Sequence, residues 1–283
     1  MAYTKEEFKQ LVDDIQSQSW YKNPIGFGIA KVDRGQINKD KILQATFPLI
    51  NWNENFGSAA VLLNALKVAG VDVDTSKSEL VCKISDEFLT SCIEAFRPFI
   101  PEAKGDAHKN VQVISTLASL PIDSGLTADD YRVVFIFEDT APESTESVYL
   151  KLYALSTGKA ALRSLNLTGA FGKLHNCAWV GNQPIELDWL RANEIVLKLS
   201  GKYPNIDMVD KFPRFLQHII PADNTRILET SKVRMGAQLA AGTTVMPGAA
   251  YVNFNAGTLG AVMVEGRISS SAVVGAGSDV GGG

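Results

Sequence analysis

The chain has 283 residues, of which 46% are hydrophobic and 20% charged, and its formal net charge is −4. A hydrophobic fraction of this size can fill the core of a globular protein. Because no long basic run occurs, nucleic-acid binding is not expected. A membrane span is not expected either, because the sequence has no uninterrupted apolar stretch of about 18 residues. The N-terminal residues lack an apolar signal core, so we expect a cytoplasmic protein.

Cysteine and histidine spacing argues against a metal site. The three cysteines are far apart and odd in number; they are Cys82, Cys92 and Cys177. The three histidines are also dispersed, at His108, His175 and His218. We therefore predict reduced, packed thiols, no metal and no tightly bound cofactor.

The N-terminal half contains several helical patterns. Thr4 followed by Glu7 is a capping-box pattern, and the apolar residues after it share one helical face, which predicts a helix over residues 4–17. A second helix is expected over residues 58–69, with Gly70 as its C-terminal stop. Two further helices are expected in parts of residues 85–97 and 108–119.

Two later segments have strand patterns. Residues 133–137 are β-branched and aromatic, and residues 149–155 partly alternate apolar and polar positions. The acidic segment 138–147 is expected to be the loop between them. The sequence therefore predicts an N-terminal α/β region over residues 1–225, either as one domain or as two with a boundary near residue 110.

The composition changes at Ile227. The last 57 residues hold 11 of the 23 glycines and only 6 charged residues. Read in sixes, they give the blocks ILETSK, VRMGAQ, LAAGTT and VMPGAA, each opening with an aliphatic residue and carrying a small residue fifth. This period is typical of a hexapeptide parallel β-helix, in which three short strands make one coil. Four consecutive matches disfavour an irregular loop rich in small residues.

The repeat then loses its phase. The block YVNFNA fits loosely from Tyr251, and the next block in phase starts at Val262, eleven residues on instead of twelve. The pattern resumes as VMVEGR, ISSSAV, VGAGSD and VGGG. Such a slip is expected where a loop of a solenoid has been recruited for function.

Charged residues follow this slip. Glu265 is the only carboxylate between Glu229 and Asp279, and its small and aliphatic neighbours favour partial burial, where loss of water suits a carboxyl group to proton transfer. A solvated, outward-facing Glu265 fits the sequence equally well. Arg267 can bind a carboxylate or phosphate through its guanidinium group, or form an outward salt bridge.

Asparagines and glycines of the same region are weaker candidates. We interpret Asn255 as a structural residue of a coil corner, while Asn253 is either structural or substrate-binding. Gly281, Gly282 and Gly283 would allow close approach of a ligand such as the pantetheine arm of coenzyme A, although glycines at a coil turn need no ligand.

The run NTRILETSKVRMGAQLAAGTTVMPGAAYVNFNAGTLG, followed by MVEGRISSSAVVGAGSDVGGG, resembles the longer-chain form of the tetrahydrodipicolinate N-succinyltransferase family. The segment NWNENFGSAA at residues 51–60 is also similar to that family. The resemblance implies a left-handed parallel β-helix over residues 226–283 and a homotrimer with active sites between adjacent β-helices. It also implies transfer of succinyl from succinyl-CoA to the amino group of ring-opened tetrahydrodipicolinate, in lysine and diaminopimelate synthesis.

The resemblance further implies roles for individual residues. The glutamate of MVEGRIS, here Glu265, is the catalytic carboxylate, and Arg267 and Gly282 contact succinyl-CoA. Glu265 either moves protons between the attacking amine and the departing thiolate, or attacks the thioester and forms an acyl-anhydride. We favour direct attack by the amine in a ternary complex, because holding both reactants together supplies much of the rate.

The sequence departs from the family in two respects. Some relatives hold magnesium near the trimer axis with acidic residues, at positions that align here with Ser231 and with Gly248 or Ala249, so no metal is expected. The chain also ends at Gly283 in mid-repeat, whereas the family continues for several coils that complete the coenzyme A groove. We therefore expect a fragment or truncated product that binds succinyl-CoA poorly and is inactive or prone to aggregation.

Two other functions fit the repeat. Another hexapeptide-repeat CoA-dependent acyltransferase, or a zinc-dependent carbonic anhydrase, would need histidines in the repeat, and residues 219–283 contain none. A non-catalytic β-solenoid scaffold leaves Glu265 and Arg267, both close to the slip, unexplained. Succinyl transfer is therefore the preferred interpretation.

Overall fold

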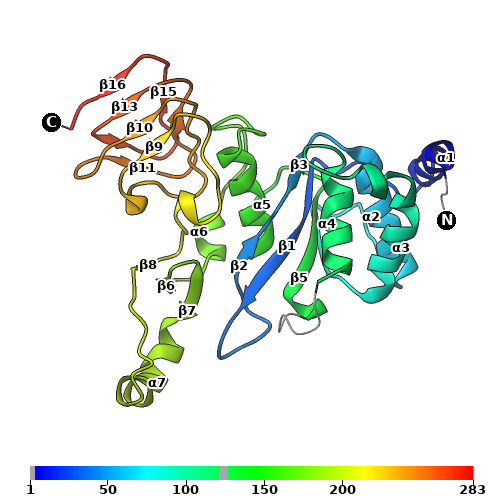
Figure 1. The fold of residues 1–283 in the computed structure, drawn as a ribbon, viewed down its shortest axis with the longest axis horizontal. Coiled ribbons are helices and arrows are strands. Elements are labelled where there is room, and N and C mark those ends of the chain that lie inside the picture. Colours follow the sequence, from blue (N-terminus) through cyan, green and yellow to red (C-terminus); the bar gives the residue numbers. More distant parts are fainter. Residues whose placement is uncertain (1–3, 121–126, 283) are drawn as a thin grey trace. The chain divides into compact units, whose positions relative to one another are not determined.

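The structure is a computed structural model that describes residues 4–120 and 127–282. The chain divides into two compact units, one formed by Met1–Val32 with Thr46–Thr140 and one by Asp33–Ala45 with Ala141–Gly283. Figure 1 shows the helices and strands of both units, coloured along the chain. Among the described residues, no helix is both long enough and apolar enough to cross a membrane.

In its described residues, the first unit combines antiparallel strands with four α-helices. Strand β1 pairs with β3 and β5, and β5 also pairs with β4, so that Phe27 of β1 lies opposite Phe135 of β5. The elements of this unit are α1 (Lys5–Gln16), β1 (Gly26–Arg34, whose last two residues belong to the second unit), β3 (Ile50–Trp52), α2 (Phe56–Val68), β4 (Glu79–Lys83), α3 (Asp86–Phe96), α4 (Lys109–Ala118) and β5 (Tyr131–Ile136).

One hydrophobic core holds this unit together. Alternate residues of the strands, among them Phe27, Val133 and Phe135, pack with the apolar faces of the four helices. The Phe27 and Phe135 rings stack with their centroids 5.9 Å apart. Cys92 lies fully buried in the same core, and all three cysteines of the chain are free, as predicted.

The predicted elements of this unit are confirmed. Helix α1 begins after Thr4, whose hydroxyl accepts a hydrogen bond from the Glu7 backbone N–H while the Glu7 carboxylate accepts one from the Thr4 N–H, both at 3.1 Å. The predicted capping box is therefore formed. Helices α2, α3 and α4 begin and end within two residues of the predicted spans, and the predicted strand at 133–137 is β5.

The predicted strand at 149–155 is wrong. These residues belong to helix α5 (Thr145–Ser156), whose N-cap Ser144 accepts a hydrogen bond from the Ser147 backbone N–H at 3.1 Å. All twelve residues of α5 are buried. A helix buried on every side has no polar stripe, so its sequence lacks the helical periodicity that would distinguish it from a strand. The segment 138–147, predicted as a loop, contains the first turn of this helix.

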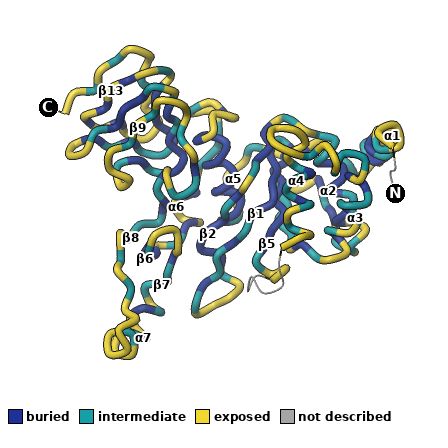
Figure 2. Tube along the Cα trace, in the orientation of Figure 1, coloured by how far each residue is buried: buried dark blue, intermediate teal, exposed yellow. Residues whose placement is uncertain are grey.

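A small antiparallel sheet precedes the repeat in the second unit. Strand β6 pairs with β7 on one side and β8 on the other, and the fully buried Trp179 of β6 donates its indole N–H to the Asp210 carbonyl of β8 at 2.9 Å. Helix α7 is largely exposed, as Figure 2 shows. The elements outside the repeat are β2 (Ile42–Thr46), α5, α6 (Ala170–Lys173), β6 (Cys177–Val180), β7 (Gln183–Glu186), α7 (Leu187–Leu199) and β8 (Met208–Asp210).

The C-terminal part consists of stacked coils of very short parallel strands. Paired strands start 16 to 19 residues apart in the sequence, and each is two residues long. Three separate ladders run through the stack, so three strands make one coil. The ladders are β9 (Arg226–Ile227), β10 (Thr244–Val245), β13 (Met263–Val264) and β16 (Asp279–Val280); β11 (Tyr251–Val252) and β14 (Arg267–Ile268); and β12 (Gly257–Thr258) and β15 (Val273–Val274).

The period of six is confirmed for the first coils. Val233, Leu239 and Val245 follow one another at six-residue spacing and are at most 5% exposed. At the predicted small-residue position of the same coils, Ala237 and Thr243 are fully buried. Aliphatic side chains therefore stack inside the coils while small residues occupy the corners.

The predicted phase after Tyr251 is wrong. Val252, not Tyr251, continues the buried column, because Val233 forms a bridge with Val252 and Val252 pairs with Ile268. The next strand of the β10 ladder places Val264, not Val262, beside Val245. One residue is thus inserted before Val252, and two are missing between Val264 and Ile268. Together, these two changes give the net slip of one residue that the sequence shows. The sequence alone does not show where each change lies.

Candidate functional site

The corner between β13 and β14 is shortened. Val264 and Ile268 both lie in the buried column but are four residues apart, where the first coils use six. The backbone N–H groups of Glu265 and Gly266 both donate to the Val280 carbonyl, at 2.8 and 2.9 Å. A Cβ atom on Gly266 would lie 2.2 Å from the Gly281 carbonyl oxygen, so only glycine fits this tight turn.

This corner directs Glu265 outward. The residue is exposed, and within the described residues no hydrogen bond or ion pair to its carboxylate is found. Of the two alternatives that the sequence left open, the single chain therefore has the outward-facing Glu265 and not the partly buried one. Successive side chains of an extended segment point to opposite faces, so the burial of Val264 and Gly266 leaves Glu265 on the outside.

Gly282 lies against the same corner from the next coil. A Cβ atom at Gly282 would be 3.2 Å from the Glu265 carbonyl oxygen and 3.5 Å from the Glu265 Cβ. Since Arg267 follows Glu265 by two residues, all three predicted site residues lie at or next to this corner, in two successive coils.

Arg267 stacks on an aromatic ring of the preceding coil. Tyr251 and Arg267 are direct partners in the parallel register of β11 and β14, and the guanidinium carbon lies 5.4 Å from the Tyr251 ring centroid. This is within the range of a cation–π interaction. Arg267 is exposed, and the outward salt bridge, one of the two alternatives that the sequence left open for it, is not formed within the described residues.

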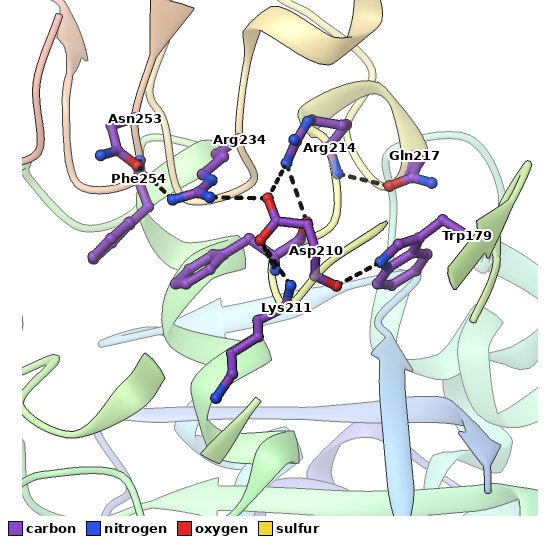
Figure 3. A network of polar contacts seen from close by, with 9 residues as sticks. Trp179, Asp210, Lys211, Arg214, Gln217, Arg234, Asn253 and Phe254 are labelled. Carbon is purple, nitrogen blue, oxygen red and sulfur yellow. Dashed lines mark hydrogen bonds and ion pairs between the residues drawn. The ribbon is translucent and has the colours of Figure 1, made fainter. Parts of the chain in front are cut away.

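A cluster of polar side chains surrounds Asp210, as Figure 3 shows. The Asp210 Oδ2 accepts hydrogen bonds from Arg214 Nη1 at 2.8 Å and from Arg234 Nη2 at 2.9 Å. Burial raises the pKa of Asp210, but the hydrogen bond from Arg214 and the positive charge of Arg234 outweigh it and hold this pKa below its ordinary value. Two guanidinium groups share one carboxylate, so these three groups keep a positive charge.

Arg234 connects this cluster to the coils. Its Nη1 donates to the Asn253 side-chain oxygen at 3.3 Å, and its guanidinium lies 5.3 Å from the Phe212 ring and 5.9 Å from the Tyr251 ring. Phe212 itself stacks on Phe254 with centroids 4.6 Å apart and planes 18° apart. Planar groups from the segment after β8 and from two coils therefore pack face to face.

Asn255 has the structural role that the sequence indicated. Its φ angle is 55°, its side-chain oxygen accepts a hydrogen bond from the Arg163 backbone N–H at 2.8 Å, and its amide donates to Ser271 Oγ at 3.3 Å. The Asn253 oxygen accepts from the Phe254 backbone N–H as well as from Arg234. These contacts of both asparagines thus stabilise the coils.

No sequence pattern pointed to Asp210, Arg214 or Arg234. Asp210 and Arg214 lie outside the repeat and follow no motif. The place of Arg234 beside Asn253 follows from the register that pairs Val233 with Val252, which the six-residue period of the sequence did not predict.

The positions compared with the magnesium ligands of relatives are engaged in other contacts. Ser231 Oγ donates to Glu229 at 2.5 Å, and Lys232 Nζ donates to the Gly248 carbonyl at 2.7 Å. Across residues 4–120 and 127–282, no group of three or more His, Cys, Asp or Glu residues is placed to hold a metal ion.

Comparison with known proteins identifies the family. Residues 6–172 match the family model described as tetrahydrodipicolinate N-succinyltransferase N-terminal, and residues 174–214 match the corresponding middle model. The chain belongs to the tetrahydrodipicolinate N-succinyltransferase family. The two matches lie outside the repeat on which the resemblance mainly rested, so the N-terminal region carries a family signature of its own.

Individual relatives agree with this assignment. A 2,3,4,5-tetrahydropyridine-2,6-dicarboxylate N-succinyltransferase from Sulfurovum sp. is 67% identical over 98% of this chain and 69% of its own length. A protein of the same name from Nitratiruptor sp. is 66% identical over 100% of this chain and 71% of its own length. A solved Campylobacter jejuni structure, assigned as a 2,3,4,5-tetrahydropyridine-2-carboxylate N-succinyltransferase, has a TM-score of 0.94 and 58% identity, covering 100% of this chain and 72% of its own.

Proposed function

We propose that this protein transfers the succinyl group of succinyl-CoA to the amino group of ring-opened tetrahydrodipicolinate, in diaminopimelate and lysine biosynthesis. The observation that carries this proposal is the 58–67% identity, over nearly the whole chain, with relatives named as N-succinyltransferases of 2,3,4,5-tetrahydropyridine-2,6-dicarboxylate. Succinyl-CoA is then a cosubstrate, not a resident cofactor.

Within this proposal Glu265 moves the protons of the reaction. The amine nitrogen attacks the thioester carbonyl carbon, the C–S bond breaks, and an amide and a thiol result. The amine loses one proton and the departing thiolate gains one, so a single carboxylate can accept the first and return it. The exposure of Glu265 supports access by both substrates.

Arg267 and Gly282 are proposed to contact succinyl-CoA. The guanidinium of Arg267 is exposed and can pair with an anionic group of the cosubstrate. Gly282 has no side chain beside Glu265, and this leaves room for a ligand near the carboxylate.

The proposal extends to architecture and location. We assign the stacked coils of residues 226–283 to a left-handed parallel β-helix and residues 1–225 to the preceding α/β region. The protein acts as a homotrimer in which a neighbouring coil stack covers the corner at Glu265. A cytoplasmic location is supported by the free thiols of all three cysteines.

Replacing Glu265 tests the proposal. We expect full-length Glu265→Ala protein to lose about 10²-fold to 10⁴-fold in kcat, because general acid–base catalysis typically contributes that much. Free thiol released from succinyl-CoA is followed with and without the amine acceptor. Glu229→Ala, which removes another exposed carboxylate of the coil region, is the matched control and should keep the wild-type kcat. A Glu265→Ala protein with full turnover would remove Glu265 from the mechanism.

The same assay separates the two chemical routes. Direct attack requires the acceptor for any thiol release. An acyl-anhydride on Glu265 would instead release about one thiol per active site without acceptor, as a burst. The direct route predicts no such burst.

A further inference from the structure

The Tyr251 ring lies between two guanidinium groups. Arg267 of the following coil is 5.4 Å from the ring centroid, and Arg234 of the preceding coil is 5.9 Å from it. Both distances are within the reach of a cation–π interaction. The register of β11 and β14 makes Tyr251 and Arg267 direct neighbours, so this contact follows from the way in which the coils stack.

The inner guanidinium is held from several sides. Asp210 accepts from Arg234 at 2.9 Å, Asn253 accepts from it at 3.3 Å, and Phe212 lies under it at 5.3 Å. The Asp210 carboxylate also offsets the charge of Arg234, which lowers the repulsion between Arg234 and Arg267 across the ring. Asp210 is itself fixed, because its backbone carbonyl accepts the indole N–H of the buried Trp179.

The outer guanidinium has a free edge. A guanidinium group that stacks on a ring keeps its N–H donors in its own plane, where they can reach an anion. Arg267 is exposed and has no hydrogen-bond partner within the described residues. Without the ring, its long side chain would sample many rotamers, and ordering it on binding would cost affinity.

We propose that Tyr251, supported by Arg234 and Asp210, is a positioning residue that orients Arg267 for the anionic cosubstrate. This inference rests on the proposed function, in which Arg267 contacts succinyl-CoA. Tyr251 itself does not touch the reacting atoms. It contributes equally to the binding of succinyl-CoA in the ground state and in the transition state, so it affects KM and not kcat.

Two substitutions of Tyr251 test this role in the full-length protein. Tyr251→Leu removes the aromatic face and should raise the KM for succinyl-CoA about threefold to tenfold, with kcat changed less than about twofold. Tyr251→Phe keeps the ring and should restore the wild-type KM. A structural role alone would not separate KM from kcat in this way. Equal KM values for the Leu and Phe variants would overturn the inference.

Two further variants separate this inference from the proposed function. Arg267→Ala should raise the KM for succinyl-CoA at least as much as Tyr251→Leu. If Arg267→Ala has no effect, the proposed role of Arg267 fails; if it has an effect and Tyr251→Leu has none, only the positioning role fails. Tyr203→Leu removes a cation–π contact with Lys198 elsewhere in the same unit and should leave KM unchanged.

Discussion

His218 shows how burial sets the protonation of a single residue. Its ring Nε2 lies 3.0 Å from the Gln44 side-chain oxygen, which can only accept, so Nε2 carries the proton. Its Nδ1 then accepts from the Tyr153 hydroxyl at 2.9 Å. Both ring nitrogens are satisfied in the neutral form, and burial lowers the pKa of His218 to about 4.

This residue predicts acid sensitivity of the fold. The unfolded state binds a proton near the ordinary pKa of 6.5, whereas the folded state does so only near 4. The contribution of His218 is therefore fully present above pH 6.5 and is lost as the pH falls from 6.5 toward 4, by about 3 kcal/mol in total. Urea unfolding at a series of pH values between 4 and 7 measures this loss.

A substitution isolates the effect of His218 from other titrating groups. His218→Gln lowers the free energy of unfolding at pH 7, but that free energy should fall less steeply toward pH 4 than in the wild type. His108→Asn replaces a partly exposed histidine whose φ of 53° asparagine tolerates, and it is the control. Parallel pH profiles for His218→Gln and the wild type would contradict the prediction.

At the scale of elements, the shortened corner decides where the predicted site residues lie. Six-residue spacing keeps the side chains of successive coils in register. In the corner where two residues are missing between Val264 and Ile268, Gly266 is buried, and Glu265 and Arg267 lie exposed on either side of it. The tight turn is possible because Gly266 has no side chain to meet the Gly281 carbonyl oxygen.

Gly266→Ala is predicted to disrupt this corner. The added Cβ would lie 2.2 Å from the Gly281 carbonyl oxygen, so the backbone of one coil must shift. We expect a loss of about 1–3 kcal/mol in the free energy of unfolding, measured by urea denaturation, together with reduced turnover. Gly275→Ala is the matched control, because its Cβ would meet only Ser278 Oγ, at 3.9 Å. Equal stabilities of the two variants would contradict the steric argument.

At the scale of the whole molecule, one chain leaves the candidate site open. Glu265, Arg267 and Gly282 are all exposed in the single chain. Acyl transfer to an amine benefits from a site that excludes water, because electrostatic interactions are stronger there. A neighbouring chain packed on the coils would supply the missing wall, as in the homotrimer that the family resemblance implies.

The trimer makes a prediction about concentration. If the neighbouring chain completes the site, the specific activity of the full-length protein should fall on dilution, in step with dissociation of the trimer. Sedimentation velocity and turnover are measured over the same range of protein concentration. Full specific activity in a monomeric fraction would show that one chain suffices.

The sequence by itself determined the family, the amphipathic elements and the period of the coils. Each of these is a local pattern: the capping box at Thr4, the helical faces after it, and an aliphatic residue every six positions from Ile227. Such patterns can be read because each depends on residues close together in the chain. The identity of Glu265, Arg267 and Gly282 as candidates also came from a contiguous motif.

Only the tertiary structure decided which faces are buried and what lies across from them. Helix α5 is buried on all sides and therefore has no periodicity to read, while the true phase of the coils depends on which strand each segment pairs with. The same pairing exposes Glu265 and sets Arg267 on Tyr251, beside Arg234 and the distant Asp210. Contacts between residues far apart in the chain are fixed by packing and register, and these leave no signal in a local sequence pattern.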